Sequence, residues 1–135
     1  MSDFPVTVFH NPACGTSRNV LAAIRQAGRE PEVVEYLKTG WTEARLRDLL
    51  TRMGEGPRAI LREKGTPAAE LGLLEEGVSD DALIAAMIVH PILVNRPIVQ
   101  TPLGAVLARP SERVFDVLDV RPDSFVKEDG EVVRS

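Results

Sequence analysis

The sequence predicts an α/β protein with a mixed sheet. Strand-like runs at residues 4–9 and 32–37 flank a helical pattern, and two short β-type runs, 98–100 and 105–107, follow much later in the chain. A strand, a helix and a strand within about thirty-five residues form a βαβ unit, whose two strands are parallel and joined by a right-handed crossover. The later runs are joined by a short turn and form an antiparallel hairpin, so both kinds of pairing are expected.

The first helix is expected over residues 15–27. Val20, Ile24 and Ala27 recur at helical spacing, and Gly28 is suited to end the helix. The turn before this helix lies at the carboxyl end of the first strand, which is where open α/β sheets usually place ligands.

A helical block at about 42–90 is expected to separate the βαβ unit from the hairpin. Thr42 and Ser79 are placed to cap helices, and Pro57 can occupy the first turn of a shorter one. The helix after Ser79 is expected to bury the face formed by Leu83, Met87 and Ile88.

A last helix is expected from Pro110 through Leu118, and the polar tail after Pro122 is expected to be loosely held. Together the elements form a thioredoxin-like layout in one domain, residues 1–135. Pro97 fits this layout, because thioredoxin-like proteins place a cis proline just before a strand and beside the catalytic thiol.

Cys14 is the only cysteine of the 135 residues, and it lies where the turn becomes the first helix. Gly15, Thr16 and Ser17 offer backbone N–H groups there, which lower a thiol pKa and can hold an oxyanion. A lone cysteine is often a buried apolar residue. Here its neighbours are Pro, Gly, Thr, Ser and Arg, which favours an activated thiolate beside an anion site.

Three absences in the sequence narrow the chemistry. The position three after Cys14 is Ser17, so an oxidised Cys14 needs an outside thiol to resolve it. A phosphatase-like loop would require arginine at position 20, where this chain has Val20. One cysteine and two histidines do not make a convincing metal site.

The composition argues against several other classes of protein. The net charge of −4 and an aromatic content of 4% argue against nucleic-acid binding. No opening segment resembles a signal peptide and no apolar run is long enough to cross a membrane, so a cytoplasmic, reducing location is expected. The 44% of hydrophobic residues can build one core.

Four stretches of the chain form a specific pattern, namely residues 10–19, 93–97, 101–104 and 109–111. Together they closely resemble the glutaredoxin-dependent arsenate reductases of the ArsC family, nearly end to end and in the same order. The resemblance implies that Cys14 is the nucleophile and that three arginines surround the bound oxyanion. Those arginines are Arg62, Arg96 and Arg109, for which a surface ion pair is the alternative.

Supporting roles are expected for further residues of the motif. Ser17 is placed to hydrogen-bond the thiolate, or is an ordinary residue of the first helical turn. His10 tunes the pocket or is structural, and Asn11 contributes an amide contact or shapes the turn. Thr16 and Arg18 line the anion cradle or face solvent.

The resemblance implies reduction of arsenate to arsenite through a Cys14 thiolate–arsenic adduct, which glutathione and glutaredoxin resolve. Glutathione is then a cosubstrate, and no bound cofactor or metal is implied. Two other classes stay open. One is a thiol-based redox regulator or interaction module of the Spx type, and the other is a glutathione-linked thiol transferase.

Overall fold

The computed structural model describes residues 4–120, 124–127, 130 and 132–134. The chain divides into two compact units, one made of residues 1–35 and 96–135 and the other of residues 36–95. The helical block expected at about 42–90 falls within the second unit. In the described part of the chain, no helix combines the length and the apolar character needed to span a bilayer.

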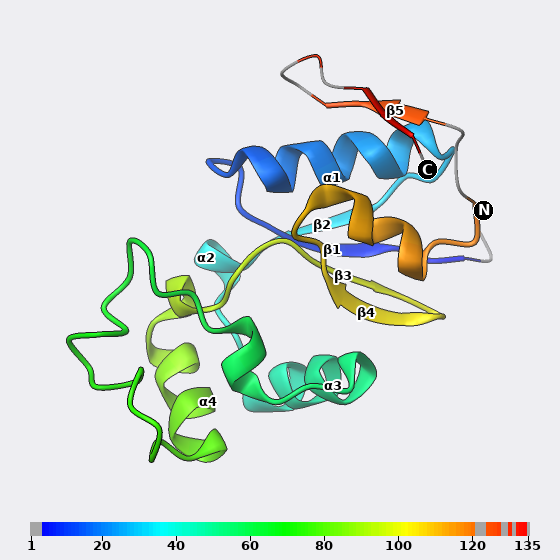
Figure 1. Cartoon of the computed structure of the whole chain (residues 1–135). Coiled ribbons are helices and arrows are strands. Elements are labelled where there is room, and N and C mark those ends of the chain that lie inside the picture. The colour runs from blue at the N-terminus through cyan, green and yellow to red at the C-terminus, as the bar shows by residue number, and fades with distance from the viewer. Residues whose placement is uncertain (1–3, 121–123, 128–129, 131, 135) are drawn as a thin grey trace. The chain divides into compact units, whose positions relative to one another are not determined.

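The first unit is built on a four-stranded sheet of order β2-β1-β3-β4 (Figure 1). β1 (Thr7–His10) pairs in parallel with β2 (Glu32–Glu35), where Thr7 lies opposite Glu32 and His10 opposite Glu35. On its other side β1 is antiparallel to β3 (Ile98–Thr101), which forms a hairpin with β4 (Gly104–Leu107). This is the thioredoxin-like mixed sheet that the sequence predicts.

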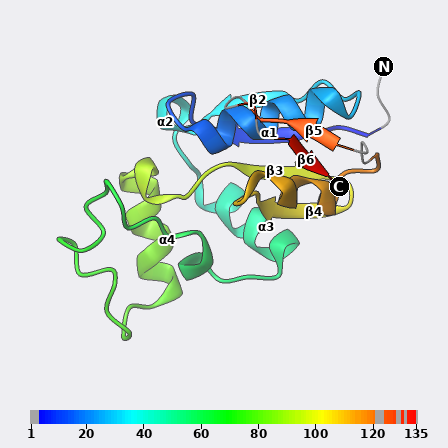
Figure 2. The same cartoon turned by 45° about the horizontal axis from the view of Figure 1, so that its top comes forward.

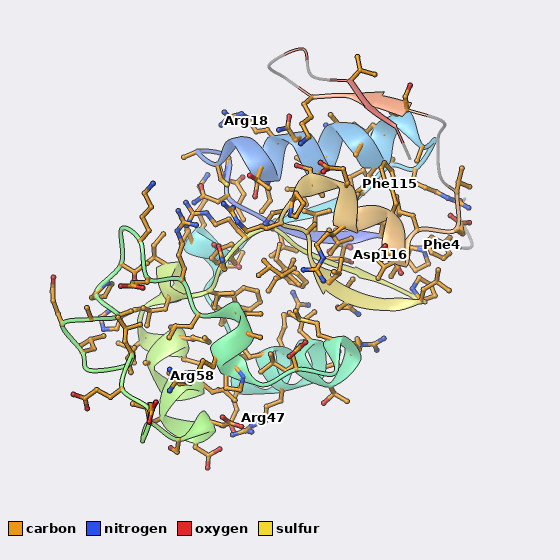
Figure 3. The ribbon with its side chains drawn as sticks, in the orientation of Figure 1. Phe4, Arg18, Arg47, Arg58, Phe115 and Asp116 are labelled. Atoms are coloured by element: carbon orange, nitrogen blue, oxygen red, sulfur yellow. The ribbon has the colours of Figure 1, made fainter. Side chains whose placement is uncertain are left out.

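Two helices cover one face of this sheet (Figures 1 and 2). They are α1 (Gly15–Gln26) and the 3₁₀ helix η3 (Ser111–Val117). Gly28, just after α1, has a φ of 87°, a left-handed conformation that favours glycine. Apolar side chains of α1, η3 and the sheet form one core cluster. It includes Val8, Val20, Ile24, Val99, Val114 and Phe115, the last of which is labelled in Figure 3.

The second unit is helical. Its elements are α2 (Tyr36–Thr39), α3 (Glu43–Met53), η1 (Pro57–Ile60), α4 (Asp80–Val89) and η2 (Pro91–Leu93). The capping predictions are confirmed, because the Thr42 hydroxyl accepts a hydrogen bond from Arg45 N and the Ser79 hydroxyl accepts one from Ala82 N. An antiparallel bridge between Leu61 and Val94 joins the segment after η1 to the segment after η2.

The first strand, expected over residues 4–9, spans Thr7–His10 instead. Four further details differ from the sequence prediction. The strand expected over 32–37 ends at Glu35, since Tyr36 begins α2. On α4 it is Ile84 that is buried with Leu83 and Met87, whereas Ile88 is 36% exposed. The last helix has 3₁₀ geometry and ends at Val117.

The fourth difference concerns the tail after Pro122. Residues 121–123, 128–129, 131 and 135 lie outside the described residues, but Ser124–Val126 and Val132–Arg134 pair as antiparallel strands β5 and β6. β5 lies beside α1 (Figure 2). An ion pair of 2.7 Å between Lys127 Nζ and Glu112 Oε1 ties this hairpin to η3. The expectation of a loosely held tail is therefore wrong for the described part.

Candidate active site

Cys14 lies between the end of β1 and the first turn of α1, as the sequence predicts. It is the N-cap residue of α1, with extended backbone angles, and its side chain makes no capping hydrogen bond. Its thiol is free and partly accessible. A sulfur at this position faces the N–H groups that begin a helix, which carry partial positive charge.

The turn before Cys14 is held by its own hydrogen bonds. Asn11 Oδ1 accepts from Ala13 N at 2.9 Å, and the Asn11 carbonyl accepts from Cys14 N at 3.0 Å. The Ser17 hydroxyl accepts from Asn11 N at 3.3 Å. From the exposed side, Arg18 Nη1 donates to the Pro12 carbonyl at 2.7 Å, and Figure 3 shows Arg18 at this end of α1. Asn11 therefore shapes the turn, the second of the two roles expected for it.

The surroundings lower the pKa of the Cys14 thiol to about 7. Partial burial opposes this change and is the largest single influence, but three donors outweigh it together. They are the backbone N–H of Ser17 and the guanidinium groups of Arg96 and Arg109. A substantial part of Cys14 is therefore thiolate, the nucleophilic form, at neutral pH.

Two of the three expected arginines lie in the same unit as the thiol. Arg109 Nη1 is 3.6 Å from Cys14 Sγ and also donates to the Arg96 carbonyl at 3.0 Å. Arg96 precedes Pro97, which is buried, and the Arg96–Pro97 peptide bond is cis, as expected. The Arg109–Pro110 bond is also cis, which the sequence did not predict.

His10 is buried at the end of β1, 6% exposed. Burial lowers the pKa of its imidazole, Glu35 opposes that change, and Arg18 and Arg25 reinforce it. His10 is therefore neutral at pH 7, and its Nδ1 has no hydrogen-bond partner among the described residues.

Arg62 belongs to the second unit, where the structure fixes its side chain. Its Nη1 donates to Asn95 Oδ1 at 3.1 Å and its Nε donates to the Lys64 carbonyl at 3.1 Å. Its backbone N–H donates to the Leu93 carbonyl at 2.7 Å. The contact of Arg62 with a bound oxyanion stays a prediction from the resemblance.

The remaining expected residues lie in the first turn of α1. Gly15 and Thr16 are partly exposed there, next to the fully buried Ser17. The Ser17 hydroxyl accepts a hydrogen bond from Asn11 N, a contact that the sequence did not predict, and the backbone N–H of Ser17 lowers the pKa of the Cys14 thiol.

Sequence reasoning missed two contacts around these residues, the bond from Arg109 to the Arg96 carbonyl and the bond from Arg62 to Asn95. The first joins residues thirteen positions apart and the second joins residues thirty-three apart. No local pattern marks either contact. The site as a whole combines a thiolate that forms near neutral pH with guanidinium groups suited to bind an oxyanion.

Comparison with known proteins agrees with this architecture. The ArsC family matches residues 9–117. An arsenate reductase of Rhizobium meliloti is 57% identical over 129 residues, 95% of this chain and 92% of that protein. An arsenate reductase of Escherichia coli is 53% identical over 129 residues, again 95% of this chain and 92% of that protein. A solved arsenate reductase from Vibrio cholerae, 39% identical, superposes with a TM-score of 0.82 over 87% of this chain and 100% of its own. The chain belongs to the ArsC family.

Proposed function

We propose that this protein reduces arsenate to arsenite, with Cys14 as the nucleophile. The observation that carries the proposal is the thiol itself, whose pKa is lowered to about 7 and whose sulfur lies 3.6 Å from Arg109 Nη1. The relatives named as arsenate reductases match 95% of the chain and support the same substrate.

In the first step the Cys14 thiolate attacks the arsenic atom. A sulfur–arsenic bond forms, and one arsenate oxygen leaves as water after it is protonated. Arsenate is a mixture of monoanion and dianion at neutral pH, and Arg96 and Arg109 are placed to offset this negative charge. Arg62 is the third cation in this proposal, on the strength of the resemblance.

The second step needs electrons from outside the chain, because Ser17 stands where a resolving cysteine would be. Glutathione attacks the adduct and forms a second sulfur–arsenic bond as a further arsenate oxygen leaves as water. A glutaredoxin thiolate then takes the glutathionyl group as a mixed disulfide and leaves the electron pair on arsenic, and a second glutathione releases glutaredoxin as glutathione disulfide forms. Water cleaves the remaining Cys14–arsenic bond. Two thiols supply the two electrons that convert arsenic from the +5 to the +3 state. The products are arsenite, glutathione disulfide and water, and the Cys14 thiolate is regenerated. Dependence on glutathione fits the cytoplasmic location expected from the sequence.

The test is arsenate-dependent oxidation of NADPH by the purified protein with glutathione, glutaredoxin and glutathione reductase. Each component is left out in turn, and phosphate replaces arsenate in one control. Turnover is expected only in the complete mixture, and Cys14→Ser is expected to abolish it while the far-ultraviolet circular dichroism stays unchanged.

Other outcomes separate the alternative functions. Turnover of a mixed disulfide with glutathione, independent of arsenate, would contradict the proposal and indicate a thiol transferase. Full arsenate turnover by Cys14→Ser would refute the thiol mechanism. Absence of any turnover, with the thiol still reactive at neutral pH, would favour a redox regulator.

A further inference from the structure

A buried hydrogen bond ties the start of the catalytic turn to the first turn of α1. Asn11 N donates to the Ser17 hydroxyl at 3.3 Å. Both residues are almost fully enclosed, Asn11 at 5% exposed and Ser17 at 0%. Because a buried N–H needs an acceptor, the Ser17 hydroxyl meets a requirement of the turn that water does not readily meet.

Asn11 in turn holds the two residues before the helix. Its side-chain oxygen accepts from Ala13 N at 2.9 Å and its carbonyl accepts from Cys14 N at 3.0 Å. The position of Asn11 therefore determines the direction from which the chain enters α1, and with it the position of the Cys14 sulfur. Ser17 is the side chain of α1 that holds Asn11 in place.

Ser17 contributes two separate groups. Its backbone N–H belongs to the first turn of α1, whose N-cap residue is Cys14, and lowers the pKa of the thiol, whereas its hydroxyl oxygen accepts a hydrogen bond from Asn11 N. We propose that Ser17 is a positioning residue, whose hydroxyl locks the Asn11–Cys14 turn so that the sulfur stays over the N–H groups of the first helical turn. The hydroxyl then acts on the thiol through Asn11 and not as a direct ligand of the thiolate.

Amide hydrogen exchange of the arsenate-free protein tests the lock directly. In the wild type the Asn11 amide is expected to exchange slowly, at the rate of the β1 amides. Ser17→Ala removes the acceptor and is expected to speed exchange at Asn11 at least about tenfold. Ser17→Thr keeps an acceptor oxygen and is expected to retain protection.

Thr101→Val is the matched control. The Thr101 hydroxyl is also buried in the first unit and bonds the Val117 carbonyl, but Thr101 lies at the far end of β3 from His10 and the turn. Thr101→Val therefore loses the buried bond to the Val117 carbonyl and the bond from Leu103 N without touching Asn11, and exchange at Asn11 is expected to stay slow.

The second measurement is the rate of alkylation of Cys14 by iodoacetamide across pH 5–10. The midpoint is expected to move up by about one pH unit in Ser17→Ala, because the sulfur loses its fixed position over the Ser17 N–H. Thr101→Val is expected to keep the wild-type midpoint.

Two results would overturn the proposal. One is an Asn11 amide that exchanges rapidly in the folded wild type, a result that needs no variant to be stable. The other is Ser17→Ala with Asn11 still protected and the midpoint raised, which would make the hydroxyl a direct thiolate ligand.

The proposal rests on the proposed function only in taking Cys14 as the nucleophile. Neither measurement uses arsenate, so a protein that fails to reduce arsenate could still show the lock.

Discussion

Arg109 is the residue whose removal tests the electrostatics of the site most directly. A single nitrogen, Nη1, lies 3.6 Å from Cys14 Sγ and 3.0 Å from the Arg96 carbonyl. Arg109→Ala removes a positive charge from the thiolate and an anchor from the backbone that carries Arg96. Both losses are expected to raise the pKa of Cys14.

The size of the effect follows from the exposure of Arg109. A hydrogen bond to a charged group contributes about 1.5–3 kcal/mol when it is shielded from water. Arg109 is half-buried, so a value near the lower end, about 1.4 kcal/mol or one pKa unit, is appropriate. The pKa then rises from about 7 to roughly 8. At pH 7 the thiolate share falls from about a half to about a tenth, and the alkylation rate falls roughly fivefold.

The assay is iodoacetamide alkylation of wild type and variant from pH 5 to 10, without arsenate. Arg25→Ala is the control, because it removes the same charge from the last turn of α1. Arg25 is 53% exposed and pairs with Glu30 at 3.2 Å. Eleven residues of helix separate it from Cys14, about 16 Å along the axis, which exceeds the screening length of about 10 Å at 0.1 M salt.

Identical midpoints for wild type and Arg109→Ala would refute this reasoning, since they would show that the guanidinium does not stabilise the thiolate. Equal shifts in Arg109→Ala and Arg25→Ala would refute it in another way, because they would indicate a general effect of net charge. Arsenate turnover is expected to fall further than the thiolate share, because Arg109 also offsets the charge of the oxyanion.

Three further outcomes are expected. The lowered pKa of Cys14 favours the folded state once the thiol ionises, so the unfolding free energy of wild type minus that of Cys14→Ser should grow from pH 7 to 9 and become constant as the pH falls well below 7 in denaturant titrations; a difference independent of pH over the whole range would contradict this. Asn95→Ala removes one of the bonds that hold the Arg62 side chain, the other being the bond to the Lys64 carbonyl, and should raise the KM for arsenate about fivefold; an unchanged KM would show that Asn95 does not position Arg62 for binding. Thr42→Ala removes the cap of α3 and should lower the unfolding free energy by about 1 kcal/mol, whereas Thr39→Ala, outside that cap, should change it less.

The elements that the sequence predicts well are those whose pattern is local. β1 alternates, α1 repeats its apolar residues at helical spacing before Gly28, and the β3–β4 hairpin has a short turn between two apolar runs. Each of these signals is contained within a few residues, and the parallel pairing of β1 with β2 follows from the expected βαβ unit.

The misplaced boundaries reflect contacts made elsewhere in the chain. Tyr36 looks like the continuation of a strand, but its hydroxyl donates to the buried Val94 carbonyl and its ring lies 5.1 Å from that of Trp41. Those contacts favour a helical turn, and strand propensity does not reveal them. On α4 the run 82–89 carries no charged residue, so nothing in the pattern identifies Ile84 as the buried isoleucine and Ile88 as the exposed one.

In the candidate site, too, the features with a local sequence signal were predicted from it, and those that depend on distant residues were not. The Cys14 turn follows from residue types that favour a strand, a tight turn and a helix start in succession. Arg96 and Arg109 are more than eighty positions from Cys14, and only the resemblance pointed to them. The bond from Asn11 N to the Ser17 hydroxyl depends on backbone geometry that residue identity does not specify.

The points where the chain leaves and rejoins the sheet have a consequence for changes in chain length. β2 ends at Glu35, opposite His10, and β3 begins at Ile98, opposite Phe9, so both points flank the carboxyl end of β1. Within the second unit, the Tyr36 hydroxyl bonds the Val94 carbonyl and so joins its first and last segments. A segment with adjacent ends can gain or lose residues at little entropic cost and without shifting the β1–β3 register. Changes of length within residues 36–95, away from Arg62, are therefore expected to leave β1 and the position of Cys14 unchanged.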